Sequence, residues 1–287
     1  MDDGRGRTSR IATPEGVDIA VHDLGGAGPP LVFAHATGFH GLVWTSVGAR
    51  LADAFHCISF DQRGHGDSSS PPDGDFDWRG FGRDILAVVG DLGLEEPLGV
   101  GHSSGGTAML LAEQARPGTF RALYCYEPVI IPAEPPLGRD MSNWLAAAAR
   151  RRRDVFASRE EAYAAYASKA PFAAWQPEVL DAYVHHGFFD RPDGTVGLKC
   201  SPEDEALVYE MATANDGFAR LGDVECPVLL AGGAESDAVG PAEIRALAGR
   251  LPHCETEALA GLGHLGPMED PQAVADSIRR FFTTLVT

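Results

Sequence analysis

Two serines between glycines are the residues whose types and spacing could best do chemistry in this sequence. Residues 101–105, Gly-His-Ser-Ser-Gly, fit the pattern G-x-S-x-G and lie between an apolar strand-like run and a helix-like run. At a sharp strand-to-helix turn the central residue is strained, and glycines two positions to either side relieve the crowding. The pattern therefore predicts that Ser103 projects as a nucleophile and that the Ser104 amide lies at the positive end of the helix.

A general base is expected downstream, in the Gly-rich run GLGHLGPMEDP (261–271). This run follows the expected last strand, CETEAL, and precedes the final helix, PQAVADSIRRFF. A loop after a strand's carboxyl end lies at the edge where an α/β sheet presents its chemistry. We therefore expect His264 to accept the proton of Ser103.

A carboxylate should fix the tautomer of that histidine and stabilise its cation. Asp237 follows the strand-like run PVLLA, and one helix and one strand fit between it and His264. The sequence therefore favours Asp237 as the acid. Two alternatives stay open: Glu235 in the same loop, and Glu127, which ends the preceding strand beside Pro128.

A second donor for an oxyanion should come from the loop in LVFAHATGFHG, after the first central strand. The backbone amides of Thr37 and Ser104 are the predicted pair. We expect His35 to brace this loop, and we interpret the remaining histidines as packing, surface or pocket-lining residues: His65, His102, His185 and His186. No His, Cys or Asp residues have metal-ligand spacing, and no metal or cofactor is expected.

The elements that must position these residues alternate along the chain. Continuous apolar runs of strand length occur at residues 31–35, 57–60, 97–103, 122–127 and 227–233, with helical patterns between them. Such runs are typical of a sheet covered on both faces. Repetition of strand and helix predicts a mostly parallel α/β sheet with right-handed crossovers. An antiparallel hairpin, RIAT and DIAVHDLG, is expected before it.

The alternation stops at Glu127 and resumes near residue 228, and the interval has no convincing strand. Helices are predicted within 137–156, 158–169, 176–187 and 201–216. Two of these helix starts carry capping signals, Ser158 with Glu161 and Ser201 with Asp204, and the second adds Pro202 at the first helical position. We expect a helical lid at residues 128–217 on a core domain of residues 1–127 and 218–287.

Two features of this interval bear on the substrate. The basic run Arg150 to Arg153 is either a solvated helix face or a site for an anionic substrate. Aromatic side chains at helical spacing pack mainly against the core, and a few of them line a moderately apolar pocket: Trp144, Phe156, Phe172, Trp175, Tyr183, Phe188 and Phe189.

Composition limits the partners. The formal net charge of −18 argues against nucleic acid or an anionic membrane surface, because the field repels phosphates. The five cysteines show no disulfide or zinc pattern and are expected to be small buried hydrophobes. The polar start of the chain and the lack of a long apolar run predict a cytoplasmic protein, and the aromatic residues of the lid predict a small-molecule substrate. The oligomeric state is not predicted.

Taken together, HATGF (35–39), DQRGHGDS (61–68), GHSSGG (101–106), the GGAESD acid loop and GLGHLGPMEDP resemble the α/β-hydrolase superfamily. The resemblance implies an eight-stranded sheet with helices on both faces, a helical cap, and a triad in the order Ser103, Asp237, His264. Two departures are an alanine, Ala36, where the oxyanion loop usually has glycine, and an acid loop one residue longer than the commonest spacing.

A serine nucleophile predicts attack on an acyl carbon and an acyl-enzyme that water releases. Hydrolysis of a carboxylic ester or lactone is therefore the leading prediction. The same triad also serves carbon–carbon bond hydrolysis of diketone-like substrates, which is an alternative. A third hypothesis is that the protein is a small-molecule receptor of the same fold.

Overall fold

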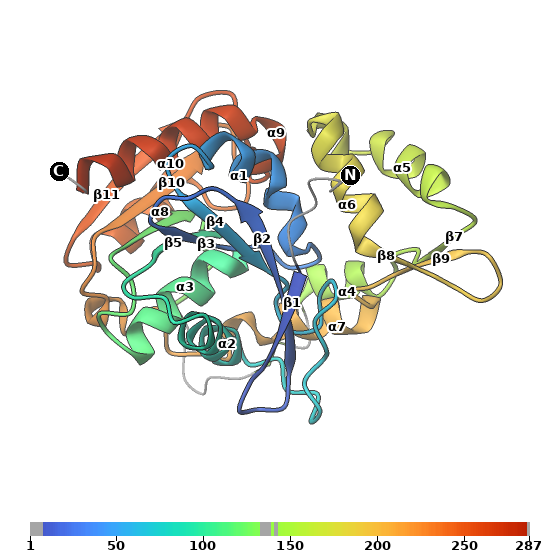
Figure 1. Cartoon of the computed structure of the whole chain (residues 1–287), viewed down its shortest axis with the longest axis horizontal. Helices are drawn as coiled ribbons and strands as arrows, with labels where there is room; N and C mark the ends of the chain where they lie inside the picture. Colours follow the sequence, from blue (N-terminus) through green and yellow to red (C-terminus); the bar gives the residue numbers. More distant parts are fainter. Residues whose placement is uncertain (1–7, 133–138, 141–142, 286–287) are drawn as a thin grey trace.

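An eight-stranded sheet forms the centre of the molecule in the computed structural model, which describes residues 8–132, 139–140 and 143–285 (Figure 1). The strand order is β1-β2-β4-β3-β5-β6-β10-β11, and every pairing is parallel except β1 with β2 and β2 with β4. The predicted eight-stranded sheet and its hairpin are confirmed. The strands are β1 (Thr8–Ala12), β2 (Asp18–Gly25), β3 (Pro30–Ala34), β4 (His56–Phe60), β5 (Leu98–His102), β6 (Ala122–Tyr126), β10 (Val228–Gly233) and β11 (Cys254–Leu259).

Helices cover both faces of this sheet, which explains why the central strands β3, β5, β6 and β10 are apolar and buried along almost their whole length. Alternate strand residues belong to different core clusters: Leu31 and Phe33 pack with one set of helices, Val32 with the other. The first set is α1 (Thr45–Leu51) and α10 (Pro271–Leu285), and the second is α2 (Trp78–Asp91), α3 (Ser104–Ala115) and α8 (Pro241–Ala248). Short helical turns complete the core at η1 (Gly41–Trp44), η4 (Leu221–Asp223) and α9 (Gly266–Glu269).

Residues 128–217, here called the insert, contribute no strand to the central sheet in their described part. Their helices lie together on one side of the molecule in Figure 1: α4 (Trp144–Ala149), α5 (Arg159–Ala167), α6 (Pro177–Gly187) and α7 (Pro202–Glu210), with turns η2 (Phe172–Ala174) and η3 (Met211–Thr213). The expectation that the insert has no strand is wrong. β7 (Val155–Phe156), β9 (Val196–Leu198) and β8 (Phe188–Asp190) form an antiparallel sheet, and strands this short carry no alternation pattern to detect.

The predicted helix starts in the insert are confirmed. Ser158 Oγ accepts from the Glu161 amide at 3.2 Å, and Ser201 Oγ accepts from the Asp204 amide at 3.0 Å. Pro202 is the first residue of α7. These caps satisfy amides that have no partner within the helix.

The helix expected within 137–156 is shorter than predicted, and residues 137, 138, 141 and 142 lie outside the described residues. Asn143 caps α4, and the helix ends at Ala149. The basic run from Arg150 to Arg153 therefore follows the helix and is not one of its faces. Arg150 instead binds Glu203 and the fully buried Glu210 of α7.

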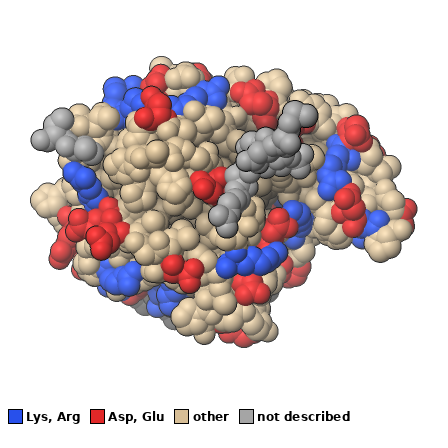
Figure 2. Space-filling model, viewed as in Figure 1, with Lys and Arg blue, Asp and Glu red and all other residues tan. Residues whose placement is uncertain are grey.

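The charged surface residues and the cysteines are arranged as expected for a globular protein. On the face shown in Figure 2, acidic and basic side chains lie intermixed. Cys57, Cys125, Cys200 and Cys226 are buried free thiols and Cys254 is partly exposed, so the prediction of buried hydrophobic cysteines holds for all but the last. In the part of the chain that is described, no helix has the length and apolar character needed to span a membrane.

Candidate active site

Ser103 lies at a sharp turn between the central strand β5 and α3. Its backbone has φ 54° and ψ −119°, which is a strained conformation for a residue with a side chain. A Cβ on Gly101 would lie 2.5 Å from the Gly106 Cα, and a Cβ on Gly105 would lie 2.5 Å from the Ala34 carbonyl oxygen. Glycine is therefore required at both positions, as the sequence pattern predicts.

The structure brings His264 to Ser103. The loop after β11 places His264 Nε2 3.2 Å from Ser103 Oγ, although the two residues are 161 positions apart in the chain. On the other side of the ring, His264 Nδ1 lies 2.6 Å from an oxygen of Glu127. A donor bond from Nδ1 leaves the lone pair of Nε2 free to accept the serine proton.

The carboxylate that contacts His264 is that of Glu127, and Asp237 does not take this place. Asp237 is exposed to solvent, and among the described residues it makes no hydrogen bond or ion pair with His264. Glu235 is also exposed. The expected pairing of Asp237 with the histidine is therefore corrected to Glu127, which the sequence left as an alternative.

Glu127 is held by the neighbouring strand β10. Its side chain is 0% exposed and accepts from the Gly233 amide at 2.8 Å and from Ser236 Oγ at 2.7 Å. A Cβ on Gly232 would come within 3.2 Å of Glu127 Cγ, so the glycine at position 232 leaves room for this side chain. Glu127 itself has φ 44°, a left-handed conformation that turns its side chain away from the strand direction.

Three side chains fix the backbone of the histidine loop. Tyr126 OH donates to the Gly263 carbonyl at 2.8 Å, and Glu269 accepts from the Gly263 amide at 2.7 Å. His102 Nε2 donates to the His264 carbonyl at 2.8 Å. Burial, and next the charge of His264, hold the pKa of His102 well below its usual value, so His102 stays neutral and serves as a donor. These positioning residues were not foreseen from the sequence, which indicates only packing for His102.

The loop after β3 lies against the start of α3. Thr37 is buried, and its hydroxyl donates to Ser104 Oγ at 3.0 Å, which ties the two segments together. His35 braces the loop as expected: its Nε2 accepts from the Gln62 amide at 2.9 Å, and its Nδ1 contacts the Ala36 carbonyl at 2.8 Å. Burial lowers the pKa of His35 to about 3, which keeps the ring uncharged.

A cavity of about 400 Å³ lies in the insert. Of the seven aromatic residues expected to supply an apolar pocket, only Phe156 lines it, and four of its eight lining residues are basic. Trp175, Tyr183 and Phe188 are instead buried in the core cluster shared with α1 and α10, and Trp144 is 73% exposed. In the described parts of the chain, no group of three or more His, Cys, Asp or Glu side chains is arranged to hold a metal.

A model of the alpha/beta hydrolase family matches residues 31–277. Among curated proteins, the bifunctional esterase/perhydrolase DCH of Acinetobacter calcoaceticus is 33% identical over 135 residues, which are 44% of this chain and 45% of that protein. The 3-oxoadipate enol-lactonase 2 of Acinetobacter baylyi is 25% identical over 248 residues, 85% of this chain and 85% of that protein. The chain thus spans less than half the length of the first curated relatives that it matches.

The architecture is also found in solved structures. The crystal structure of E-2-(acetamidomethylene)succinate hydrolase superposes with a TM-score of 0.84 at 21% identity, covering 97% of this chain and 99% of that chain. At this identity the likeness concerns the fold alone.

Proposed function

Since the chain belongs to the alpha/beta hydrolase family, we propose that it is a serine hydrolase that cleaves a carboxylic ester or lactone through an acyl-enzyme. The observation that carries this proposal is the continuous chain of contacts from Ser103 Oγ through His264 to Glu127. It supplies a nucleophile, a base and a buried carboxylate in the order that acyl transfer needs.

In the proposed mechanism His264 Nε2 accepts the proton as Ser103 Oγ attacks the carbonyl carbon. Glu127 accepts a hydrogen bond from Nδ1 throughout and stabilises the imidazolium that forms. His264 then gives its proton to the departing alcohol, or to the alkoxide of an opened lactone ring. A water molecule, deprotonated by the same nitrogen, attacks the acyl carbon and releases the acid and Ser103.

We assign the oxyanion to the backbone amides of Thr37 and Ser104. The Ser104 amide lies in the first turn of α3, where the helix dipole is positive. The Thr37 hydroxyl bond to Ser104 Oγ supports this assignment, because it holds the two segments side by side. Loss of one such donor lowers turnover on the order of 10²–10³-fold in enzymes of this type.

The domain division belongs to the same proposal. Residues 1–127 and 218–287 would carry the site, and residues 128–217 would act as a cap over it. The contact between Tyr183 of the insert and the carbonyl of Gly38, beside Thr37, supports this arrangement.

The test is a screen of p-nitrophenyl esters and lactones with the native protein and with Ser103→Ala. Removal of the hydroxyl should lower kcat on the order of 10⁶-fold, because the nucleophile is lost while the cavity and fold remain. Circular dichroism and thermal unfolding of both proteins serve as the folding control. Equal activity of the variant would contradict the proposal, and stoichiometric ligand binding without any turnover would favour a receptor.

A further inference from the structure

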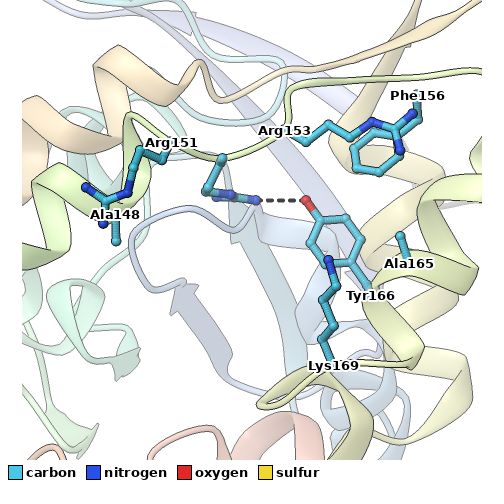
Figure 3. Close-up of a pocket in the computed structure, with 8 residues that line it drawn as sticks. Ala148, Arg151, Arg153, Phe156, Ala165, Tyr166 and Lys169 are labelled. Atoms are coloured by element: carbon cyan, nitrogen blue, oxygen red, sulfur yellow. Dashed lines mark hydrogen bonds between the residues drawn. The ribbon is translucent and has the colours of Figure 1, made fainter.

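The cavity in the insert has an unusual lining for a protein of this charge. Ala148 and Arg151 stand on one side of it, and Phe156, Tyr166 and Lys169 on the other (Figure 3). Arg152 and Arg153 complete a set of four basic residues around about 400 Å³, in a chain whose formal net charge is −18. A volume of this size suits a small molecule.

Two of these cations have a carboxylate partner, and the other two have none among the described residues. Arg152 binds Glu205, and Arg153 binds Glu161 at 2.8 Å. Arg151 and Lys169 make no ion pair with any described residue, and both are exposed. Like charges held close together repel one another, so an anion in the cavity would relieve this repulsion. The excess of positive over negative charge in the lining therefore favours an anion as the bound molecule.

The cavity is connected to the proposed active site through Arg152. Its guanidinium donates to Tyr166 OH at 3.1 Å and to Tyr183 OH at 2.8 Å, and Tyr183 OH donates to the Gly38 carbonyl at 3.5 Å. A Cβ on Gly38 would lie 2.7 Å from Glu205 Oε1 and 3.3 Å from Arg152 Nη1, so the ion pair of these two side chains lies beside Gly38.

Gly38 follows Thr37 directly, and consecutive Cα atoms are about 3.8 Å apart. One residue of the basic lining, Arg152, therefore lies together with its partner Glu205 beside the loop to which we assign the oxyanion. A short acyl chain bound at Ser103 could present its far end to these cations.

We infer that this cavity binds a carboxylate of the substrate, so that the ester or lactone cleaved at Ser103 carries a separate anionic group. The inference rests on the proposed function, because it names the substrate class of the same site. Arg152, fixed by Glu205 and two tyrosines, presents a rigid guanidinium, and Lys169 and Arg151 add mobile charge at the mouth.

The experiment compares two esters that differ only at the far end of the acyl chain. The anionic ester is mono-p-nitrophenyl glutarate, and the neutral control is p-nitrophenyl pentanoate, which has the same number of acyl carbons. The native protein should have a kcat/KM at least about tenfold higher for the glutarate ester, mainly through a lower KM. The ratio should fall as sodium chloride is raised, because salt screens the exposed cations.

The variants are Arg151→Gln, Lys169→Gln and the double variant, which remove charges that no described carboxylate needs. Each single substitution should lower the selectivity ratio about threefold or more, and the double variant should lower it further, since only Arg152 and Arg153 then remain in the lining. Arg191→Gln is the matched control, because Arg191 is a cation of the insert that does not line the cavity. It should keep the native ratio.

The outcomes separate this inference from the proposed function. Ser103-dependent hydrolysis of both esters at equal kcat/KM, or a ratio unchanged in the double variant, would overturn the inference and leave the hydrolase standing. Absence of Ser103-dependent hydrolysis of either ester would overturn the hydrolase. Glutarate itself should inhibit pentanoate hydrolysis competitively, whereas purely noncompetitive inhibition would place the anion away from the substrate and overturn the assignment.

Discussion

The loop after β6 and the loop after β10 both bring a carboxylate to the edge of the sheet where Ser103 lies, but they hold it in opposite surroundings. Glu127, after β6, is fully buried and accepts hydrogen bonds from Gly233, Ser236 and His264. Asp237, after β10, is exposed. Water screens an exposed charge, so the attraction between Asp237 and a nearby imidazolium would be weak.

The loop after β10 also contributes to the site. It supplies the Gly233 amide and the Ser236 hydroxyl, which orient the carboxylate of the other loop. The comparison teaches that the position of an acid along the chain does not decide its role. The carboxylate that contacts the histidine is the one that is buried and whose oxygens are fixed by hydrogen-bond donors.

The largest expected effect distinguishes the two loops directly. Glu127→Gln keeps the shape of the side chain but removes its charge, and it should lower kcat on the order of 10⁴-fold, as loss of the acid does in a serine triad. Asp237→Asn should leave kcat within about twofold, since exposed groups away from the contacts contribute little. Rates of ester hydrolysis, together with thermal unfolding curves of the two variants, check both expected changes in kcat. The reverse pattern would show that the β10 loop provides the acid.

A second experiment moves the carboxylate from one loop to the other. Ser236 Oγ lies 2.7 Å from the Glu127 oxygen that contacts His264, so an aspartate at position 236 would reach the same region. In the Glu127→Gln background, Ser236→Asp should restore kcat roughly tenfold, a fraction of the loss. Ser236→Asn in that background is the control of equal size. Equal activity of the two double variants would mean that the charge cannot act from the β10 loop.

A smaller effect is expected when only the supporting donor is removed. Ser236→Ala deletes one hydrogen bond to the buried carboxylate, and such bonds to charged groups contribute about 1.5–3 kcal/mol. Because Gly233 still donates to Glu127, kcat should fall by about tenfold or less. Steady-state kinetics with the neutral ester, p-nitrophenyl pentanoate, measures this change in kcat. A loss as large as that of Glu127→Gln would mean that Ser236 itself, and not the carboxylate, serves the histidine.

The smallest effect at neutral pH concerns His102, a third buried group at this edge. Its pKa is lowered in the folded protein, so below about pH 6.5 the unfolded chain binds a proton that the folded chain does not. Stability should therefore fall with decreasing pH by about 1.4 kcal/mol per pH unit from this residue alone. His102→Gln should lower the slope of the urea-unfolding free energy against pH by that amount between about pH 6 and pH 5. Parallel curves for the two proteins would contradict the assignment.

Much of the fold was predictable because strands that are buried on both faces of a sheet form continuous apolar runs in the sequence. The apolar runs of the central strands and the glycines around Ser103 are visible as local patterns, although the contacts that require them include distant residues such as Ala34. The capping serines, Ser158 and Ser201, are visible as local patterns too. Such features are visible in a short window of sequence.

The acid was less predictable because its choice depends on distant contacts. Glu127 accepts hydrogen bonds from Gly233 and Ser236, which are more than a hundred residues away in the chain. No residue next to Glu127 in the sequence indicates those donors. The course of Arg150 to Arg153 depends likewise on Glu203, Glu205 and Glu210 of α7. Partners of this kind are set by tertiary packing, which single-sequence patterns do not report.

The three clamps on the histidine loop, from Tyr126, His102 and Glu269, all arise from outside the insert. A designer could therefore exchange residues 128–217 for a different segment and keep these clamps on the histidine loop. The new segment would have to replace the contacts that the insert makes with the rest of the chain. Among them are the bond from the Tyr183 hydroxyl to the Gly38 carbonyl and the bond from the Gln176 side chain to the Glu269 carbonyl. Evolution of new specificities on this scaffold would have to preserve contacts of the same kind.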